Sequence, residues 1–148
     1  MAHELMFDDA DPYLGRLRTI ALALPGAAER ISHGSPNFFT QRTFAVFGGA
    51  IKGEPYAPRA RRAVLVKADP LIREALLAEE RFFFPAYVGG AGWVGLSFFD
   101  PGSPDEGSPD AVDWDEVAEL VETSYLLTAP ARLVREFHQQ AGSAPPPA

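Results

Sequence analysis

The chain has 148 residues, of which 47% are apolar and 22% charged, and its formal net charge is −7. These values are typical of one soluble globular domain, and no apolar stretch approaches the roughly 20 residues that a membrane-spanning helix needs. The chain has no cysteine, which excludes disulfides, thiolate metal sites and thiol catalysis. Residues 1–4 lack the start of a secretory signal, so we expect a cytoplasmic protein without membrane contact.

The first predicted element is a helix with clear signals at both ends. Asp11 is a suitable N-cap and Pro12 fits the first turn, whereas Pro25 and Gly26 end the helix. Its apolar residues recur at helical spacing, which predicts that one face packs on a core. That face consists of Leu14, Leu17, Ile20, Ala21 and Leu24.

Patterns typical of strands follow this helix. Residues 37–40 and 43–47 are separated by two residues, which predicts a tight hairpin. Residues 52–61 contain two prolines and are expected to form a loop or wing. Residues 62–67 then form a third strand, in which Lys67 falls on the face opposite Val64 and Val66.

The middle of the chain predicts another helix and two more strands. The helix is expected from Asp69 to Glu80. Its expected buried side consists of Leu71, Ile72, Ala75 and Leu76. Strands at 82–85 and 93–98 follow, joined by a glycine-rich turn at 87–92.

The last third of the chain begins with an acidic loop and ends in helices. Residues 100–110 are rich in Pro, Gly and Ser, which predicts a loop. Asp113 begins a capping box for a third helix. The inner face of that helix consists of Val117, Leu120, Val121 and Tyr125. A short helix restarts near Pro130, and residues 139–148 are predicted to be a disordered Pro/Ala tail.

This order of elements predicts a single α+β domain over residues 1–138. Short strands joined by tight turns favour an antiparallel sheet of about five strands with helices on one face, in two layers of order α-β-β-β-α-β-β-α-(α). Val94, Leu96 and Phe98 share one strand face, which supports burial on one side of the sheet.

The charges are strongly polarised along the chain. Residues 30–67 contain one acid, Glu54. They also contain seven bases: Arg30, Arg42, Lys52, Arg59, Arg61, Arg62 and Lys67. Residues 100–122 contain nine acids and no base. The acidic total can therefore conceal a basic face.

Two interpretations of the basic segment remain open. In the first, a hairpin and a wing contact nucleic-acid phosphates. The candidate contact residues are Arg42, Lys52, Arg59, Arg61, Arg62, Lys67 and Trp93. In the second, the bases pair with acids of the 100–122 segment, and these pairs cancel the field. Most aromatic residues are expected in the core, but Tyr87 and Trp93, beside glycines, are left as candidate stacking platforms for bases.

No catalytic or metal motif competes with the basic segment. His33 lies beside Ser32 and near Ser35, but catalysis also needs an orienting acid and an oxyanion site, and a turn is the favoured role. Three scattered histidines without a carboxylate cluster predict no metal site, and we expect no cofactor. The glycines at 89–92 lack the lysine and hydroxyl of a phosphate-binding loop.

Six short motifs together resemble those of the MmcQ/YjbR family, over roughly residues 12–135. In chain order they are Leu22-Ala23-Leu24-Pro25-Gly26-Ala27 with Glu29, Phe44-Ala45-Val46-Phe47, Val64-Leu65-Val66-Lys67-Ala68-Asp69-Pro70, Tyr87-Val88-Gly89, Gly92-Trp93-Val94 and Ser124-Tyr125-Leu126-Leu127. The resemblance implies a compact α+β domain likened to the CyaY and secretion-chaperone folds. It also implies DNA binding through a double wing of strands, and it supplies no catalytic residue.

The sequence therefore favours a non-enzymatic nucleic-acid-binding protein with DNA as the expected partner. The alternative is a protein-interaction or small-ligand-binding module that uses the open sheet face, with a homodimer as one form. A contiguous positive surface would favour nucleic acid, whereas a large apolar patch around Trp93 would favour association.

Overall fold

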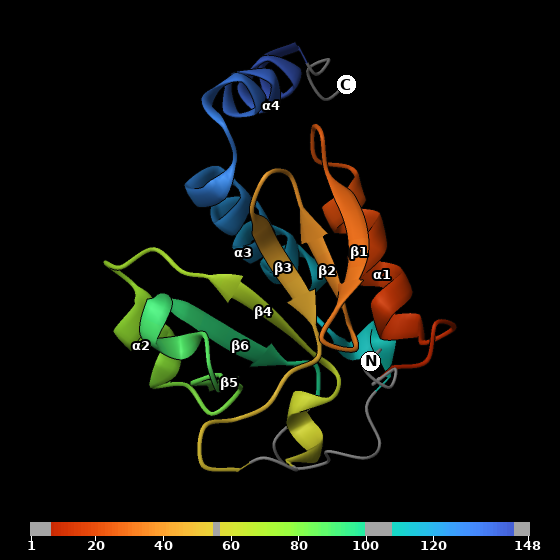
Figure 1. Ribbon diagram of the computed structural model, residues 1–148, viewed down its shortest axis with the longest axis vertical. Helices are drawn as coiled ribbons and strands as arrows, with labels where there is room; N and C mark the ends of the chain where they lie inside the picture. Colours follow the sequence, from red (N-terminus) through yellow and green to blue (C-terminus); the bar gives the residue numbers. More distant parts are fainter. Residues whose placement is uncertain (1–6, 55–56, 100–107, 144–148) are drawn as a thin grey trace.

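The computed structural model describes residues 7–54, 57–99 and 108–143. These residues form an antiparallel sheet with helices packed on one face, as Figure 1 shows. The strands are β1 (Ala28–Ser32), β2 (Ser35–Phe39), β3 (Thr43–Phe47), β4 (Ala63–Lys67), β5 (Phe82–Phe83) and β6 (Trp93–Ser97). The helices are α1 (Pro12–Leu22), α2 (Arg73–Leu77), α3 (Trp114–Thr128) and α4 (Ala131–Ser143), with short 3-10 turns η1 (Pro58–Ala60), η2 (Gly89–Ala91) and η3 (Pro109–Ala111). The predicted α+β class is confirmed, with strand order β1-β2-β3-β4-β6-β5.

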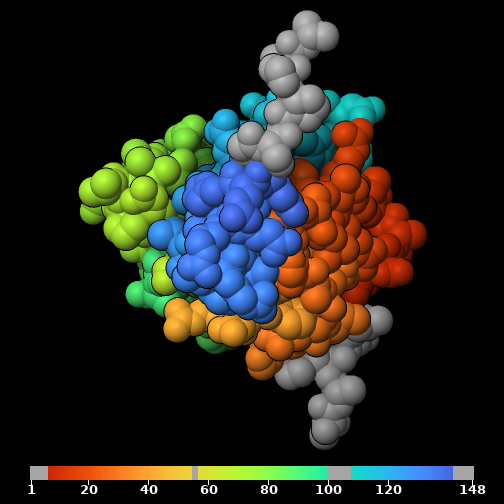
Figure 2. All heavy atoms as spheres, turned by 90° about the horizontal axis from the view of Figure 1, so that it is seen from above, coloured from red at the N-terminus to blue at the C-terminus, as the bar shows by residue number. Residues whose placement is uncertain are grey.

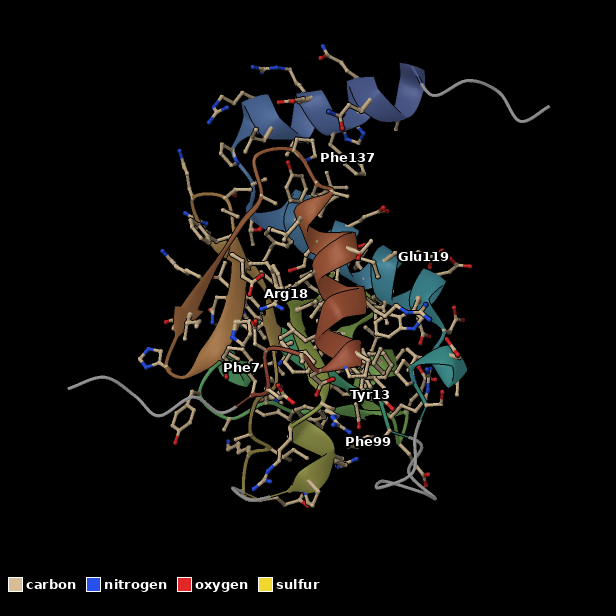
Figure 3. The ribbon with its side chains drawn as sticks, turned by 90° about the vertical axis from the view of Figure 1, so that its right-hand side faces the viewer. Phe7, Tyr13, Arg18, Phe99, Glu119 and Phe137 are labelled. Atoms are coloured by element: carbon tan, nitrogen blue, oxygen red, sulfur yellow. The ribbon has the colours of Figure 1, made fainter. Side chains whose placement is uncertain are left out.

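Helix α1 begins at the predicted cap. The Asp11 carboxylate accepts a hydrogen bond from the Tyr13 backbone N–H at 2.9 Å, and Pro12 occupies the first helical position. On the side of the helix facing β1, the guanidinium of Arg18 (labelled in Figure 3) forms an ion pair with Glu29 at 2.9 Å. The hydrogen bond from Arg18 to Glu29 raises the pKa of the arginine, and it ties the helix to the first strand.

Strand β1 is the element that sequence patterns miss. It pairs with β2 along its whole length, from Ala28 opposite Phe39 to Ser32 opposite Ser35. Its side chains are all exposed or half-buried, so the chain has no apolar alternation there to predict a strand. His33 and Gly34 form the turn with φ of 53° and 82°, as a two-residue hairpin with the twist of a sheet requires. The sheet therefore has six strands rather than five.

The predicted hairpin of β2 and β3 is confirmed, with one irregularity. Phe38 lies opposite Ala45 but Phe39 lies opposite Thr43, so Phe44 is the extra residue of a bulge. The bulge lets Phe44 and Ala45 both be fully buried. The ring of Phe44 packs edge-on against Tyr125 of α3, with ring centres 5.4 Å apart.

Helix α3 is fixed across the middle of the sheet by buried hydroxyl groups. The Ser124 hydroxyl donates to the Phe44 carbonyl at 2.6 Å and accepts from the Lys67 backbone N–H at 2.9 Å. The Tyr125 hydroxyl donates to the Pro25 carbonyl at 2.6 Å, at the end of α1. Because each of these buried groups has a partner, the contacts fix the position of the helix without an unsatisfied polar atom. The predicted cap is also confirmed: the Asp113 carboxylate accepts from the Glu116 backbone N–H at 3.2 Å.

The outer face of the sheet, which is the face opposite α1 and α3, is covered where β4 and β6 lie. A second buried cluster forms there, separate from the main core. Its buried members are Ile51, Ala60, Ala63, Leu65 and Phe83. The ring of Phe83 lies directly on Gly95 of β6, where a Cβ atom would stand 2.2 Å from the ring. Helices α1 and α3 lie on one face as predicted, but the other face is not fully open.

Helices α2 and α4 differ from the sequence predictions. The Asp69 carboxylate accepts from the Leu71 backbone N–H at 2.9 Å and makes a turn, so α2 starts only at Arg73. The expected buried side of this helix is wrong: Leu71 is 92% exposed and Ile72 and Ala75 are also exposed, while Leu76 is half-buried. Helix α4 lies across one end of the domain (Figure 2) and is helical over 139–143, where a disordered tail was predicted. Residues 144–148 lie outside the described part of the chain, as does most of the predicted loop, 100–107.

Replacing Gly95 by alanine is expected to lower the free energy of unfolding by about 2 kcal/mol, because the new methyl group would displace the buried Phe83 ring. The control is Gly15→Ala in α1, where nothing lies within 4 Å of the added Cβ. That change should raise the free energy of unfolding by about 0.5–1 kcal/mol. Urea denaturation followed by circular dichroism measures both. Equal stability of the two variants would show that the Phe83 ring does not rest on β6.

Candidate nucleic-acid interface

The predicted wing is a connection that packs on the outer face of the sheet. We call residues 48–54 and 57–62 the outer connection. Its backbone is held at both ends, since the Gly49 N–H donates to the Ala60 carbonyl at 2.8 Å and the Lys52 N–H donates to the Phe84 carbonyl at 3.1 Å. The side chain of Ile51, in this connection, is buried in the second cluster. The basic side chains of this segment are therefore mounted on a fixed backbone rather than on a projecting wing.

The predicted phosphate-contacting residues of the outer connection differ in their exposure and in the contacts that their charged groups make. Lys52 and Arg61 are exposed, and among the described residues no acid lies within 4.0 Å of either charge. Arg59 is half-buried, and its guanidinium donates to the Glu80 carbonyl at 3.0 Å and lies 5.9 Å from the centre of the Phe83 ring. Lys52 and Arg61 are accordingly the two bases here that are available to an incoming anion.

Arg62, which was also predicted to contact phosphates, holds the base of α1 instead. Its Nε lies 2.8 Å from the Asp11 carboxylate, whose side chain is only 6% exposed. The same guanidinium lies over the ring of Tyr13, 5.3 Å from its centre. Burial raises the pKa of the Tyr13 hydroxyl, and the charge of Arg62 partly opposes this rise. Figure 3 shows Tyr13 and Phe99 close together beneath α1, where the same guanidinium also faces Phe99.

The remaining predicted contact residues lie elsewhere on the sheet. Arg42 is exposed in the turn between β2 and β3, at the opposite end of β3 from the outer connection. At about 3.4 Å per residue, that strand places the two regions about 17 Å apart. Lys67 and Trp93 lie opposite each other on β4 and β6, both half-buried, and Trp93 packs against the second cluster. The hairpin and the wing therefore do not form one continuous surface.

The described acids of residues 108–122 that form ion pairs do so with bases outside residues 30–67. Asp110 forms an ion pair with Arg16 at 2.5 Å, and Glu116 forms one with Arg81 at 2.6 Å. Glu119 on α3 points away from the sheet (Figure 3). Within the described parts of the chain, Arg62 is the only lysine or arginine of residues 30–67 in an ion pair. The acids at 108–122 thus leave the outer basic residues uncompensated at contact distance.

A shallow cavity of about 530 Å³ opens between the outer connection and the segment that follows β5. It is lined by Ala50, Ile51, Lys52, Gly53, Phe84, Ala86, Tyr87 and Gly90. Tyr87 is completely exposed and has a φ of 70°, in the left-handed region. The Lys52 ammonium lies 5.4 Å from the centre of the Phe84 ring. The residues lining this opening therefore include a lysine and two aromatic residues, of which Tyr87 is fully exposed to solvent.

Arg73 and Phe84 lie in this region and were not among the predicted site residues. Arg73 of α2 lies with its guanidinium 5.5 Å from the centre of the Phe84 ring, and it donates a short hydrogen bond to the Gly89 carbonyl. Gly89 packs under Phe84, where a Cβ atom would stand 2.3 Å from the ring. Arg73 lies outside the basic segment, and the run of three phenylalanines is typical of a buried strand. The sequence therefore has no local signal that would join them.

The other candidates from the sequence occupy ordinary structural positions. His33 forms the turn between β1 and β2, and Ser35 lies opposite Ser32 in the same hairpin. Glu29, the nearest acid in sequence, is on the α1 side and paired with Arg18. Among residues 7–54, 57–99 and 108–143 no three potential metal ligands gather at one place. Over the same ranges, every helix is too short or too polar to cross a membrane.

Together these features define a small antiparallel α+β domain in which, among the described residues, acids lie on the helical layer and the exposed bases Lys52 and Arg61 of the outer connection have no acid partner. A family model for YjbR matches residues 22–127, from the end of α1 to the end of α3. The chain therefore belongs to the MmcQ/YjbR family. No curated protein and no solved structure matches the chain.

Arg62→Met is expected to lower the free energy of unfolding by about 2 kcal/mol, because it leaves the buried Asp11 carboxylate without its cation. The value lies below that of a fully buried pair since Arg62 itself is 43% exposed. Arg61→Met removes an exposed neighbour that forms no ion pair within the described residues, and it should change stability by less than about 0.5 kcal/mol. Thermal and urea unfolding of both variants test this difference. Equal losses would mean that the ion pair does not support α1.

Proposed function

We propose that the protein binds nucleic acid through the outer face of its sheet, with Lys52 and Arg61 contacting phosphates. One observation carries the proposal: in the described chain, six of the seven bases of residues 30–67 have no acid within 4.0 Å. Uncompensated lysine and arginine side chains on a rigid backbone are what phosphate contacts require, because binding gains from the release of counterions. The chain belongs to the MmcQ/YjbR family, and the DNA binding that this resemblance implies is consistent with DNA as the partner.

The distribution of charge between the two layers supports the same function. The acids of α3 and of the segment before it lie on the helical side, where Asp110 and Glu116 are paired with bases of that side. The exposed bases Lys52 and Arg61 belong to the outer connection, on the opposite face. A polyanion can therefore approach the outer face although the whole chain has a net charge of −7. We expect recognition to be mainly electrostatic, without readout of a defined base sequence.

The alternative, an interaction module that associates through the sheet face, has less support. Trp93 packs against the second cluster and is half-buried, and it is absent from the large exposed apolar residues of the described chain. The outer face around β4 and β6 is occupied by the outer connection itself. A flat apolar surface of the kind that pairs with a second subunit is therefore replaced by a folded segment of the same chain.

Charge reversal at Lys52 and Arg61 is expected to weaken binding to DNA and to reduce its dependence on salt. Each phosphate contact contributes about 0.9 to the slope of log K against log salt for a duplex and about 0.7 for a single strand. The variant Lys52→Glu/Arg61→Glu should therefore lose about 1.4–1.8 from the slope. Fluorescence anisotropy with a labelled single strand and a labelled duplex, over about 50–200 mM salt, measures the change.

The matched control is Arg132→Glu/Arg135→Glu on α4, which makes the same change of net charge. Both arginines are exposed, and Figure 1 shows α4 at the end of the molecule opposite the outer connection. Its slope should stay that of the wild type. No binding of either DNA at low salt, binding that is independent of salt, or an equal loss of slope in both double variants would contradict the proposed function.

A further inference from the structure

We propose that the cavity beside Tyr87 takes one unpaired nucleotide, with its base stacked on the Tyr87 ring and its phosphate on Lys52. The identity of this ligand rests on the proposed function and makes it more specific: the protein would prefer single-stranded nucleic acid to a duplex. The cavity is bounded by two segments of fixed backbone, the outer connection and residues 84–90.

Tyr87 exposes its aromatic ring to solvent and does not help to pack either buried cluster. The residue is 101% exposed and belongs to neither buried cluster. Its φ of 70° is a conformation that residues other than glycine rarely adopt. A base is a suitable partner for such a ring, since every base offers a flat face and stacking tolerates any sequence.

The charges around the cavity match a phosphate. Lys52 lines the opening and is exposed without an acid partner in the described chain, and Glu54, two residues on, forms no ion pair there. Behind the Phe84 ring, Arg73 adds a second positive charge that no described acid contacts. Its Nε is buried and has no hydrogen-bond partner in the structure. Arg73 does not line the cavity and its guanidinium also donates to the Gly89 carbonyl, so it adds positive potential near the opening while Lys52 is the base that can contact a phosphate.

The size and shape of the cavity determine which form of nucleic acid can enter. Its volume of about 530 Å³ falls within the range of about 300–1,000 Å³ that is common for ligand sites. In a duplex the bases are stacked and paired, and one of them would reach Tyr87 only after leaving the stack, at a cost in free energy. An unpaired base does not meet this cost.

The test compares a labelled oligothymidylate with a labelled duplex of equal length by fluorescence anisotropy at low salt. The wild type should bind the single strand more tightly. Tyr87→Ala should lose about 5- to 150-fold in affinity for the single strand, since one stacked base is removed. Tyr87→Phe should stay within about twofold of the wild type, because it keeps the ring. Leu71→Ala, which shortens another exposed apolar side chain, is the control and should bind like the wild type.

The outcomes separate this inference from the proposed function. Absence of binding to both DNA forms would overturn both. If both forms bind and Tyr87→Ala changes neither affinity, the nucleotide site is wrong, while salt-dependent binding through Lys52 and Arg61 stands. Equal affinity of the wild type for strand and duplex would also overturn the site.

A competition experiment uses unlabelled thymidine monophosphate. Displacement of the labelled strand by this nucleotide supports the cavity as the binding site. Binding of the nucleotide without binding of the strand overturns the assignment to single strands. Unchanged urea unfolding shows that Tyr87→Ala is folded.

Discussion

The contact between the Phe83 ring and the backbone of Gly95 determines what the outer face of the sheet becomes. Because Gly95 has no side chain, the Phe83 ring packs directly against the backbone of β6, and Phe83 is 3% exposed. Ile51 and Leu65 complete the buried cluster beside it, and this apolar burial stabilises a segment that contains little regular structure. The residue after Phe83 and the residue after Ile51 then point toward one opening, so the positions of Phe84 and Lys52 follow from this packing.

A second constraint is electrostatic and acts between the two layers. The helical layer uses its acids locally, in ion pairs such as Asp110 with Arg16 and in the cap that Asp113 provides for α3. Acids near a helix N-terminus are also favoured by the helix dipole. Within the described residues, the bases of the outer connection have no such partners apart from Arg62, and aromatic rings lie near two of them, Phe84 near Lys52 and Phe83 near Arg59. A strongly acidic chain can in this way keep one face suited to anions.

The parts of the fold that depend on neighbouring residues are predictable from the sequence. Asp11 and Asp113 cap their helices as expected, and Val94 and Leu96 lie in the main core, but the predicted one-sided burial is wrong because Gly95 and Ser97 of β6 are buried as well. Strand β1 escapes prediction because exposed residues such as Arg30 remove its apolar pattern, and only pairing with β2 makes it a strand. The candidate site depends on contacts between distant residues. Arg62 is drawn away by Asp11, 51 positions earlier, and Arg73 reaches Phe84 through a turn that no local pattern indicates.

The most direct test of this account is to map the surface that nucleic acid contacts. The backbone amides of ¹⁵N-labelled protein would be followed by NMR while a short single strand is added. We expect the largest shifts at residues 50–53 and 86–90, which flank the cavity, with smaller shifts around Arg61. Amides of α1 and α3 should stay unchanged. Shifts confined to the helical layer, or to the turn that carries Arg42, would contradict the claim that the outer connection is the nucleic-acid interface.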